Sequence, residues 1–309
     1  MITTIFSKSK PFNYFLVTIL LVLCFFLYQF KNTEWLDSAA GIGKKAVLLL
    51  LLIGSLFISN FITKKNGLSK DTTFPFLFFF VFLILFPTTL GNTDLIISNF
   101  FILLALRRLI SLQSLVTPKE KIFDASLWIF LASLFHFWSI LFIILVFVSI
   151  ALHVGRDYKN WILPYIAFFT MATLYVVFAL IYDTNLFREL LNDATFNFEF
   201  DYFTNKYQNM AISIYATITA LFVFTQIISL PSKPLIHHNS YKKIIMAFFI
   251  GFVIYLISPQ KNNSILIYTF MPLAVMASGY FEGVKIKWSG EITAIIVVGL
   301  SVLSFTMQL

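Results

Sequence analysis

The chain has 309 residues, of which 59% are hydrophobic and 12% are charged, and its formal net charge is +8. Soluble domains average roughly 45–50% apolar and about 25% charged residues, so this composition excludes a water-soluble core. The basic balance does not indicate nucleic acid as a partner, because Lys and Arg accumulate in the cytoplasmic loops of membrane proteins.

Long apolar blocks follow one another along the chain, at 12–30, 46–63, 74–90, 95–110, 125–152, 161–182, 209–230, 243–258, 264–281 and 291–307. Blocks approaching about 20 residues match a helix that crosses a bilayer of roughly 30 Å. Stretches such as FPFLFFFVFLILF (74–86) lack the alternation of a membrane β-strand. The sequence therefore predicts an all-α polytopic transmembrane helix bundle with about 10–11 spans. No linker is polar and long enough for a soluble domain, so we expect a single membrane domain over 1–309.

The first block follows a basic start and contains about 17–19 apolar residues, longer than the usual 7–15 of a signal peptide. We expect a retained first helix with its N-terminus in the cytoplasm, because this orientation puts nine basic residues of the first half inside and three outside. The 39 Phe residues are typical of an AT-rich bacterial genome, which favours a bacterial inner membrane. The only cysteine, Cys24, lies in this block, so neither a disulfide framework nor a thiolate metal cluster is expected.

The first outer loop, KNTEWLDSAAGIGKK, holds Glu34 and Asp37 three residues apart. On a helical turn this spacing places both carboxylates on one face, where they can hold a cation or act as base and orienting group. They are the candidate catalytic residues. The alternative is a solvated loop whose acids cap the next element.

The fourth block carries three candidate binding residues. Asp94 begins this helix, and Arg107 and Arg108 end it, with guanidinium geometry suited to phosphate. Helix capping by Asp94 and cytoplasmic anchoring by the arginines are the alternatives.

The uncharged run 125–152 either crosses once or forms a hairpin that turns near His136. As a single helix its 28 residues span about 42 Å, long even when tilted. The hairpin places 16 basic residues inside and 6 outside, whereas one crossing gives 12 and 10. The positive-inside rule therefore favours the hairpin, with arms of about 14 residues and a turn that is buried by protein or lines a wet cavity.

His136 is the only histidine well inside an apolar block and is a further candidate binding residue. The alternative is a hydrogen bond across a helix pair. With four histidines in the chain, a membrane di-iron oxygenase is excluded. We expect no metal and no cofactor.

With the hairpin, the segment 183–208 faces the periplasm as an amphipathic loop. It contains a short helix at 184–194 and then interleaved Phe and Tyr, which suit the membrane interface. This loop is a candidate docking surface for an envelope protein partner.

Several of these features together resemble GT-C type glycosyltransferases and the related polymerases of lipid-linked sugars. They are the basic N-terminus, the acids Glu34 and Asp37, the passage LFHFWSILF (134–142), the aromatic and acidic loop 183–210 and the late apolar pair at 258–281. The resemblance implies a polyprenyl-phosphate-linked substrate, with Glu34 or Asp37 as base or metal ligand. The adjacent acidic pair of that class is absent. The chain also resembles bacterial inner-membrane proteins without an assigned activity.

Three functions are therefore open. The first is the handling of a lipid-linked sugar or lipid intermediate at the periplasmic face. The second is a non-enzymatic membrane subunit or scaffold of an envelope complex. The third is a transporter, although the paired broken helices of many transporters are not evident. Membrane lipids are partners in each case.

Overall fold

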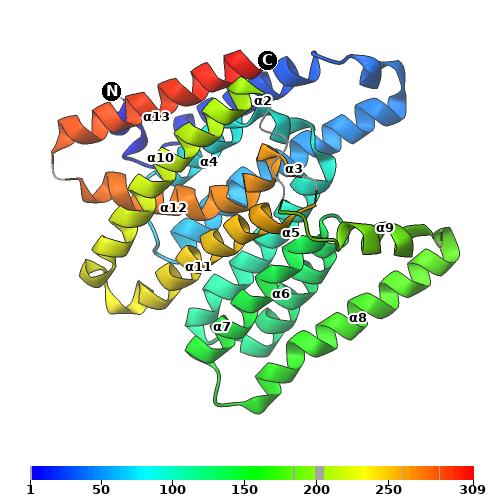
Figure 1. Cartoon of the computed structure of the whole chain (residues 1–309). Helices are drawn as coiled ribbons and strands as arrows, with labels where there is room; N and C mark the ends of the chain where they lie inside the picture. The colour runs from blue at the N-terminus through cyan, green and yellow to red at the C-terminus, as the bar shows by residue number, and fades with distance from the viewer. Residues whose placement is uncertain (1, 184, 199–204, 260, 285) are drawn as a thin grey trace.

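The computed structural model describes residues 2–183, 185–198, 205–259, 261–284 and 286–309 (Figure 1). This part of the chain contains α-helices and short 3₁₀ helices and no strand. The α-helices are α1 (Ile2–Phe6), α2 (Pro11–Gln29), α3 (Ala39–Lys65), α4 (Phe74–Leu85), α5 (Thr93–Ile110), α6 (Pro118–Ser133), α7 (Ile143–His153), α8 (Tyr158–Tyr182), α9 (Asn185–Asp193), α10 (Lys206–Ser229), α11 (Leu235–Ile257), α12 (Ile267–Gly283) and α13 (Lys287–Gln308). The 3₁₀ helices are η1 (Glu34–Asp37), η2 (Pro87–Gly91), η3 (Ser111–Ser114), η4 (Phe137–Phe142), η5 (Leu230–Ser232) and η6 (Asn263–Leu266).

Eight helices of the described chain are long and apolar enough to cross a membrane: α2, α3, α5, α8, α10, α11, α12 and α13. Two shorter apolar helices accompany them, α4 and the η4–α7 arm at Phe137–His153. With α6, these make eleven helical segments of the described chain. The predicted all-α multi-pass bundle is confirmed.

The two ends are defined by contacts of the chain termini. At the N-terminal end, Thr3 N–H donates to Glu291 Oε2 (3.1 Å). At the C-terminal end, Lys31 Nζ donates to the carbonyl of Gln308 (3.3 Å), and Gln308 Nε2 donates to the carbonyl of Leu85 (3.1 Å). The first and last helices therefore leave the two chain termini at opposite ends of the bundle.

The run 125–152 does not cross once, because its helix breaks between Ser133 and Phe137. Lys121, near the start of α6, donates to the carbonyl of Ser111 (2.9 Å), and His153, at the end of α7, meets Lys243 (3.2 Å). Lys243 also donates to the carbonyl of Leu109 at the end of α5. Both outer ends of the pair thus lie beside the end of α5, and the predicted hairpin is confirmed.

The arms of the hairpin are longer than the predicted 14 residues. The helix α6 has 16 residues because it begins at Pro118, before the uncharged run, where Pro is well accommodated at the first helical position. The returning arm runs from Phe137 to His153.

The centre of the bundle is formed by α4 and α12, which pack on each other. Every residue of α4 is buried, and aromatic rings fill the contacts around it, as in the stacked pair Phe78 and Phe281 (4.8 Å between centroids). A helix that is apolar on all sides is stable only when other helices surround it. Pro87 then ends the helical run and starts η2, so the predicted block 74–90 is shorter as a helix.

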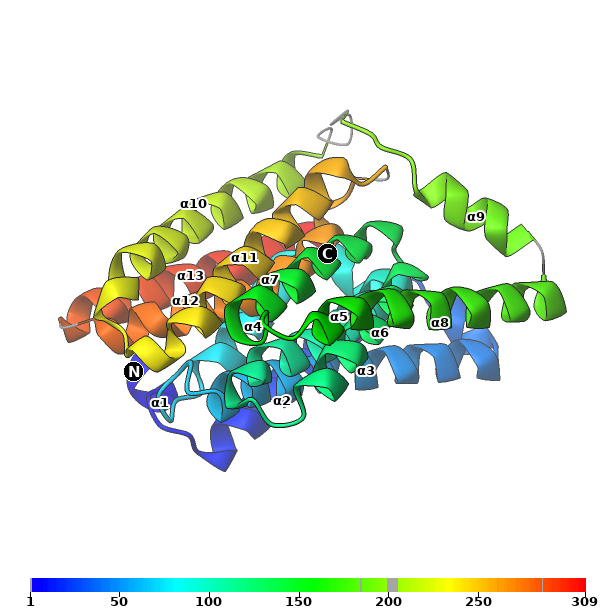
Figure 2. The ribbon, with the colours of Figure 1, turned by 90° about the horizontal axis from the view of Figure 1, so that it is seen from below.

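One arm of the molecule, α8 with α9, stands away from the bundle (Figures 1 and 2). The first half of α8 packs on α6, as at Phe168 against Phe130 (5.3 Å), while Leu180, Ile181 and Tyr182 are exposed. The helix α9 runs back from the far end of α8 toward the bundle (Figure 2). It confirms the short helix predicted at 184–194, while 199–204 lie outside the described residues.

Candidate functional site

A polar recess of about 130 Å³ lies at the C-terminal end of the bundle. It is lined by the start of α5, the turn of the hairpin, the end of α9 and the loop after α11. Its lining residues are Asn92, Asp94, Leu95, Phe135, His136, Asp193, Pro259, Asn262 and Ile265. A wider recess of about 560 Å³ shares Asn92, Asp94 and Asn262 and adds Tyr28, Lys44, Thr88, Gly91, Thr93 and Ser264. Two predicted site residues, Asp94 and His136, therefore line one site.

Asn92, and not Asp94, caps helix α5. The Oδ1 atom of Asn92 accepts a hydrogen bond from Leu95 N–H (3.2 Å), as an N-cap side chain does. Asp94 lies inside the first turn, where the helix dipole favours a negative charge. Its carboxylate forms no ion pair with a described basic residue and lines both recesses. The capping role considered for Asp94 thus belongs to Asn92.

The hydrogen bonds around His136 fix its tautomer. Its Nε2 atom lies 3.1 Å from Ser258 Oγ, and Ser258 Oγ donates to the carbonyl of Ile254 (2.7 Å). Because a hydroxyl has one proton, Ser258 accepts from the Nε2–H group of His136. The lone pair on Nδ1 of the neutral ring is then left to accept a proton or a hydrogen bond. The same contact ties the hairpin turn to the end of α11, as the helix-pair alternative predicts.

Asp193 is a site residue that the sequence did not single out. It ends α9 and lines the recess. Burial, together with the negative charge of Asp94, raises the pKa of Asp193 above its usual range. The negative charge of Asp94 thus disfavours the ionised form of Asp193, and a cation or a hydrogen-bond donor in the recess would offset this effect. In the sequence, only the acidic character of the segment 183–208 indicated that this residue could belong to a site.

The segment after α9 is fastened across the hairpin turn. Trp138 Nε1 donates to the carbonyl of Thr195 (3.2 Å), and the rings of Trp138 and Phe196 lie 4.4 Å apart. Asn197 N–H donates to the carbonyl of Ile257 at the end of α11 (3.3 Å). These contacts hold Asp193 at the recess.

Glu34 and Asp37 lie in the exposed helix η1 at the same end of the bundle, but line neither recess. The backbone N–H of Glu34 donates to Asn32 Oδ1 (3.1 Å), and Asn32 Nδ2 donates to Glu34 Oε2 (3.3 Å). The structure therefore does not bring the predicted catalytic pair together with His136.

Arg107 and Arg108 lie at the N-terminal end of the bundle, the opposite end from Asp94. Arg108 pairs with Asp124 (2.8 Å), and the guanidinium of Arg107 lies over the ring of Phe61 (4.9 Å). The four predicted binding residues thus divide into two pairs at opposite ends of α5.

Among the described residues, no three His, Cys, Asp or Glu side chains gather so that they could hold a metal ion. Comparisons of the chain with protein-family models, with curated proteins and with solved structures find no match.

Proposed function

We propose that this multi-pass membrane protein resides in a bacterial inner membrane and handles an amphiphilic intermediate, such as a lipid-linked sugar, at the C-terminal end of its bundle. The distribution of basic residues favours the periplasm for this end. The observation that carries the proposal is the recess in which His136, Asp94 and Asp193 meet. His136 lies within the apolar run 125–152, and an ionisable group within a membrane segment is a functional candidate by default.

The chemistry of the recess suits a hydroxyl-rich ligand. The Nδ1 lone pair of His136 is the available base for a sugar hydroxyl, and the amides of Asn92 and Asn262 offer both donors and acceptors. The wider recess adds Lys44, a cation for a phosphate next to the sugar. Glu34 and Asp37 remain predicted catalytic residues of the same membrane face.

A deletion strain tests this proposal through its lipid-linked glycans, profiled by mass spectrometry. We expect altered glycans that are restored by the wild-type chain but not by His136→Gln or Asp94→Asn at equal expression. Glu120→Gln, a charge-neutralising change of an exposed residue at the other end, serves as the matched control. Unchanged glycans in the deletion strain would contradict the proposal.

The second candidate is a non-enzymatic subunit of an envelope complex. It is favoured by Phe196 and Phe198, two residues of the segment after α9 that are 65% and 68% exposed. Aromatic residues are enriched at protein interfaces. A partner that copurifies in mild detergent with wild type, and is lost with Phe196→Ser and Phe198→Ser, supports this candidate. Recovery of the chain alone under several conditions argues against it.

A further inference from the structure

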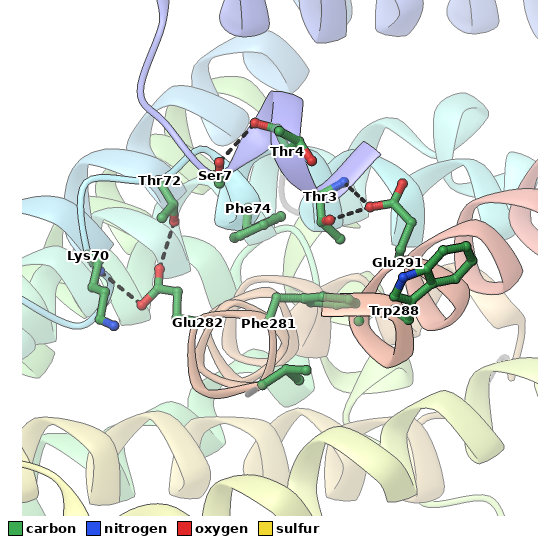
Figure 3. A pocket seen from close by; sticks show the side chains of 12 residues that line it. Thr3, Thr4, Ser7, Lys70, Thr72, Phe74, Phe281, Glu282, Trp288 and Glu291 are labelled. Atoms are coloured by element: carbon green, nitrogen blue, oxygen red, sulfur yellow. Dashed lines mark hydrogen bonds between the residues drawn. The ribbon is translucent and has the colours of Figure 1, made fainter. Parts of the chain in front are cut away.

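A second cavity, of about 530 Å³, lies at the N-terminal end of the bundle (Figure 3). It is open to the surface, and its lining residues come from α1, the loop before α4, the start of α4, the end of α12 and the start of α13. The rings of Phe74 and Phe281, stacked 5.5 Å apart, form its apolar floor, and Thr3, Thr4 and Ser7 bring hydroxyl groups to its other side. This volume is within the range of about 300–1,000 Å³ typical of small-molecule sites.

Two glutamates flank the apolar floor of this cavity (Figure 3). Glu282 accepts hydrogen bonds from the hydroxyl of Thr72 (2.7 Å), from Lys70 N–H (3.0 Å) and from the Ser69 hydroxyl. Glu291 accepts from Thr3 through its Oε2 atom, while its Oε1 atom is buried without a hydrogen-bond partner among the described residues. Both side chains therefore line the cavity as hydrogen-bond acceptors.

These glutamates differ from the aspartates at the same end of the bundle. The ion pairs of the described chain join Asp71 to Lys64 (2.8 Å), Asp124 to Arg108 (2.8 Å) and Asp157 to Lys119 (3.4 Å). In contrast, Glu282 and Glu291 accept only from hydroxyl and backbone groups and form no ion pair with a described basic side chain. The cavity therefore presents two carboxylates, of which Glu291 also meets the positive charge of the chain's N-terminus.

The position of the cavity fits the headgroup layer of a bilayer. It lies where α12 ends at Gly283 and where the apolar span of α13 begins at Trp288. The Trp288 side chain is 79% exposed, and tryptophan is enriched where membrane and water meet. A ligand at this level can reach the carboxylates with a polar group and the phenylalanine rings with an apolar one.

We propose that this cavity binds a phospholipid whose headgroup carries a primary ammonium, of the ethanolamine type. The three N–H donors of the ammonium match the oxygens of Glu282, Glu291 and the neighbouring hydroxyl groups. Lys70, which also lines the cavity, offers a cation to the lipid phosphate. A headgroup without the ammonium would bring its phosphate to two carboxylates and is disfavoured. This site is independent of the recess at the other end of the bundle.

Native mass spectrometry of the full-length protein, stripped of lipid in detergent, tests the proposal. Phosphatidylethanolamine, phosphatidylglycerol and phosphatidylcholine with identical acyl chains are titrated separately. We expect phosphatidylethanolamine to bind about tenfold more tightly than the other two, and Glu291→Gln to abolish this difference. Glu120→Gln, at the same end of the bundle, should leave the preference unchanged.

Substitutions at Gly290 provide a second test, because they change the shape of the cavity without changing its charge. A Cβ at Gly290 would meet Val284 Cγ1 at 3.5 Å and Phe281 Cδ1 at 3.9 Å, which is ordinary contact. Gly290→Ala should therefore retain the lipid, while the longer side chain of Gly290→Leu should fill the cavity and weaken binding about tenfold. Equal binding of phosphatidylglycerol and phosphatidylethanolamine, or a preference that survives both Glu291→Gln and Gly290→Leu, would overturn the proposal. It would also fail as a lipid site if soluble phosphoethanolamine bound as tightly as the lipid.

Discussion

Two adjacent lysines on α11 show how position decides the role of a charged residue. Lys243 is 1% exposed, and its Nζ donates to the carbonyl of Leu109 (2.6 Å) and to His153 Nε2 (3.2 Å), whereas Lys242 is exposed. The carbonyl is at the C-terminal end of α5, where the helix dipole favours a cation. Positive-inside counting placed both lysines on one side but did not distinguish their roles.

We predict that Lys243→Met lowers the free energy of unfolding by about 1–3 kcal/mol, because two buried acceptors lose a charged donor. Lys242→Met should change it by less than about 0.5 kcal/mol, as surface substitutions usually do. Thermal unfolding of both variants in the same detergent measures the difference. Equal melting temperatures would contradict the capping role of Lys243.

We predict that Asp193 makes the attachment of α9 dependent on pH. Its pKa in the folded protein is raised by burial and by Asp94, so the folded state keeps a proton that the detached segment releases. The attachment should therefore weaken as the pH rises through this raised pKa and strengthen as the pH falls. Hydrogen exchange of 185–198, corrected for intrinsic rates, should slow as the pH is lowered through the raised pKa of Asp193 toward the usual pKa of an aspartate.

The variant Asp193→Asn should show slower exchange of this segment already at neutral pH and lose the pH dependence. Asp94→Asn removes the repelling charge and should shift the transition to lower pH. Protection that is independent of pH in the wild type would contradict the coupling of the two carboxylates. The sequence could not reveal this coupling, since Asp94 and Asp193 are brought together only by the hairpin and the returning arm.

At the scale of elements, thiol labelling from outside the cell tests the hairpin topology. In a Cys24→Ala background, we expect Asn192→Cys to be labelled and Lys159→Cys to be labelled only after permeabilisation. Both positions are exposed, unlike Asn160, which is 3% exposed and donates to the carbonyl of Val154. Glu34→Cys provides the matched control on the side of Asn192. Labelling of Lys159→Cys in intact cells would contradict the hairpin.

The boundaries of the elements show what the apolar pattern can and cannot predict. It located α5, whose ends carry Asp94 and the arginine pair, because charges at both ends mark where the apolar run stops. It overextended α4, because the apolar block continues past Pro87 into η2. Similarly, the pattern missed that α6 starts at Pro118, since the charged first turn of that helix lies outside the apolar run.

At the scale of the molecule, charge and geometry agree on the two ends of the bundle. Described basic residues that positive-inside counting placed together lie at the N-terminal end, where Lys121 donates to the carbonyl of Ser111 and Arg108 pairs with Asp124. The recess with Asp94 lies at the other end, in agreement with the predicted separation of the faces. That His136 and Asp94 line one recess could be predicted only in part, because the predicted hairpin places its turn at the same end of the bundle as the start of α5.

The number of segments decides where the chain termini lie. The sequence predicted about 10–11 spans and so left the side of the C-terminus open. Eleven segments place the termini on opposite sides, as do the contacts of Thr3 with Glu291 and of Lys31 with Gln308. With the N-terminus in the cytoplasm, alkaline phosphatase fused after Leu309 should be active and green fluorescent protein at the same position dark.

Fusions after Lys65, at the end of the second span, provide the matched control and should give the opposite pair of signals. A fluorescent fusion after Leu309 would mean that one segment does not cross, and α4 is the segment to suspect because it has only 12 residues. Its complete burial argues otherwise, since surrounding helices can shield the ends of a short helix from lipid. Inserting three leucines after Leu83 would then be expected to disturb packing against α12 rather than to improve the crossing.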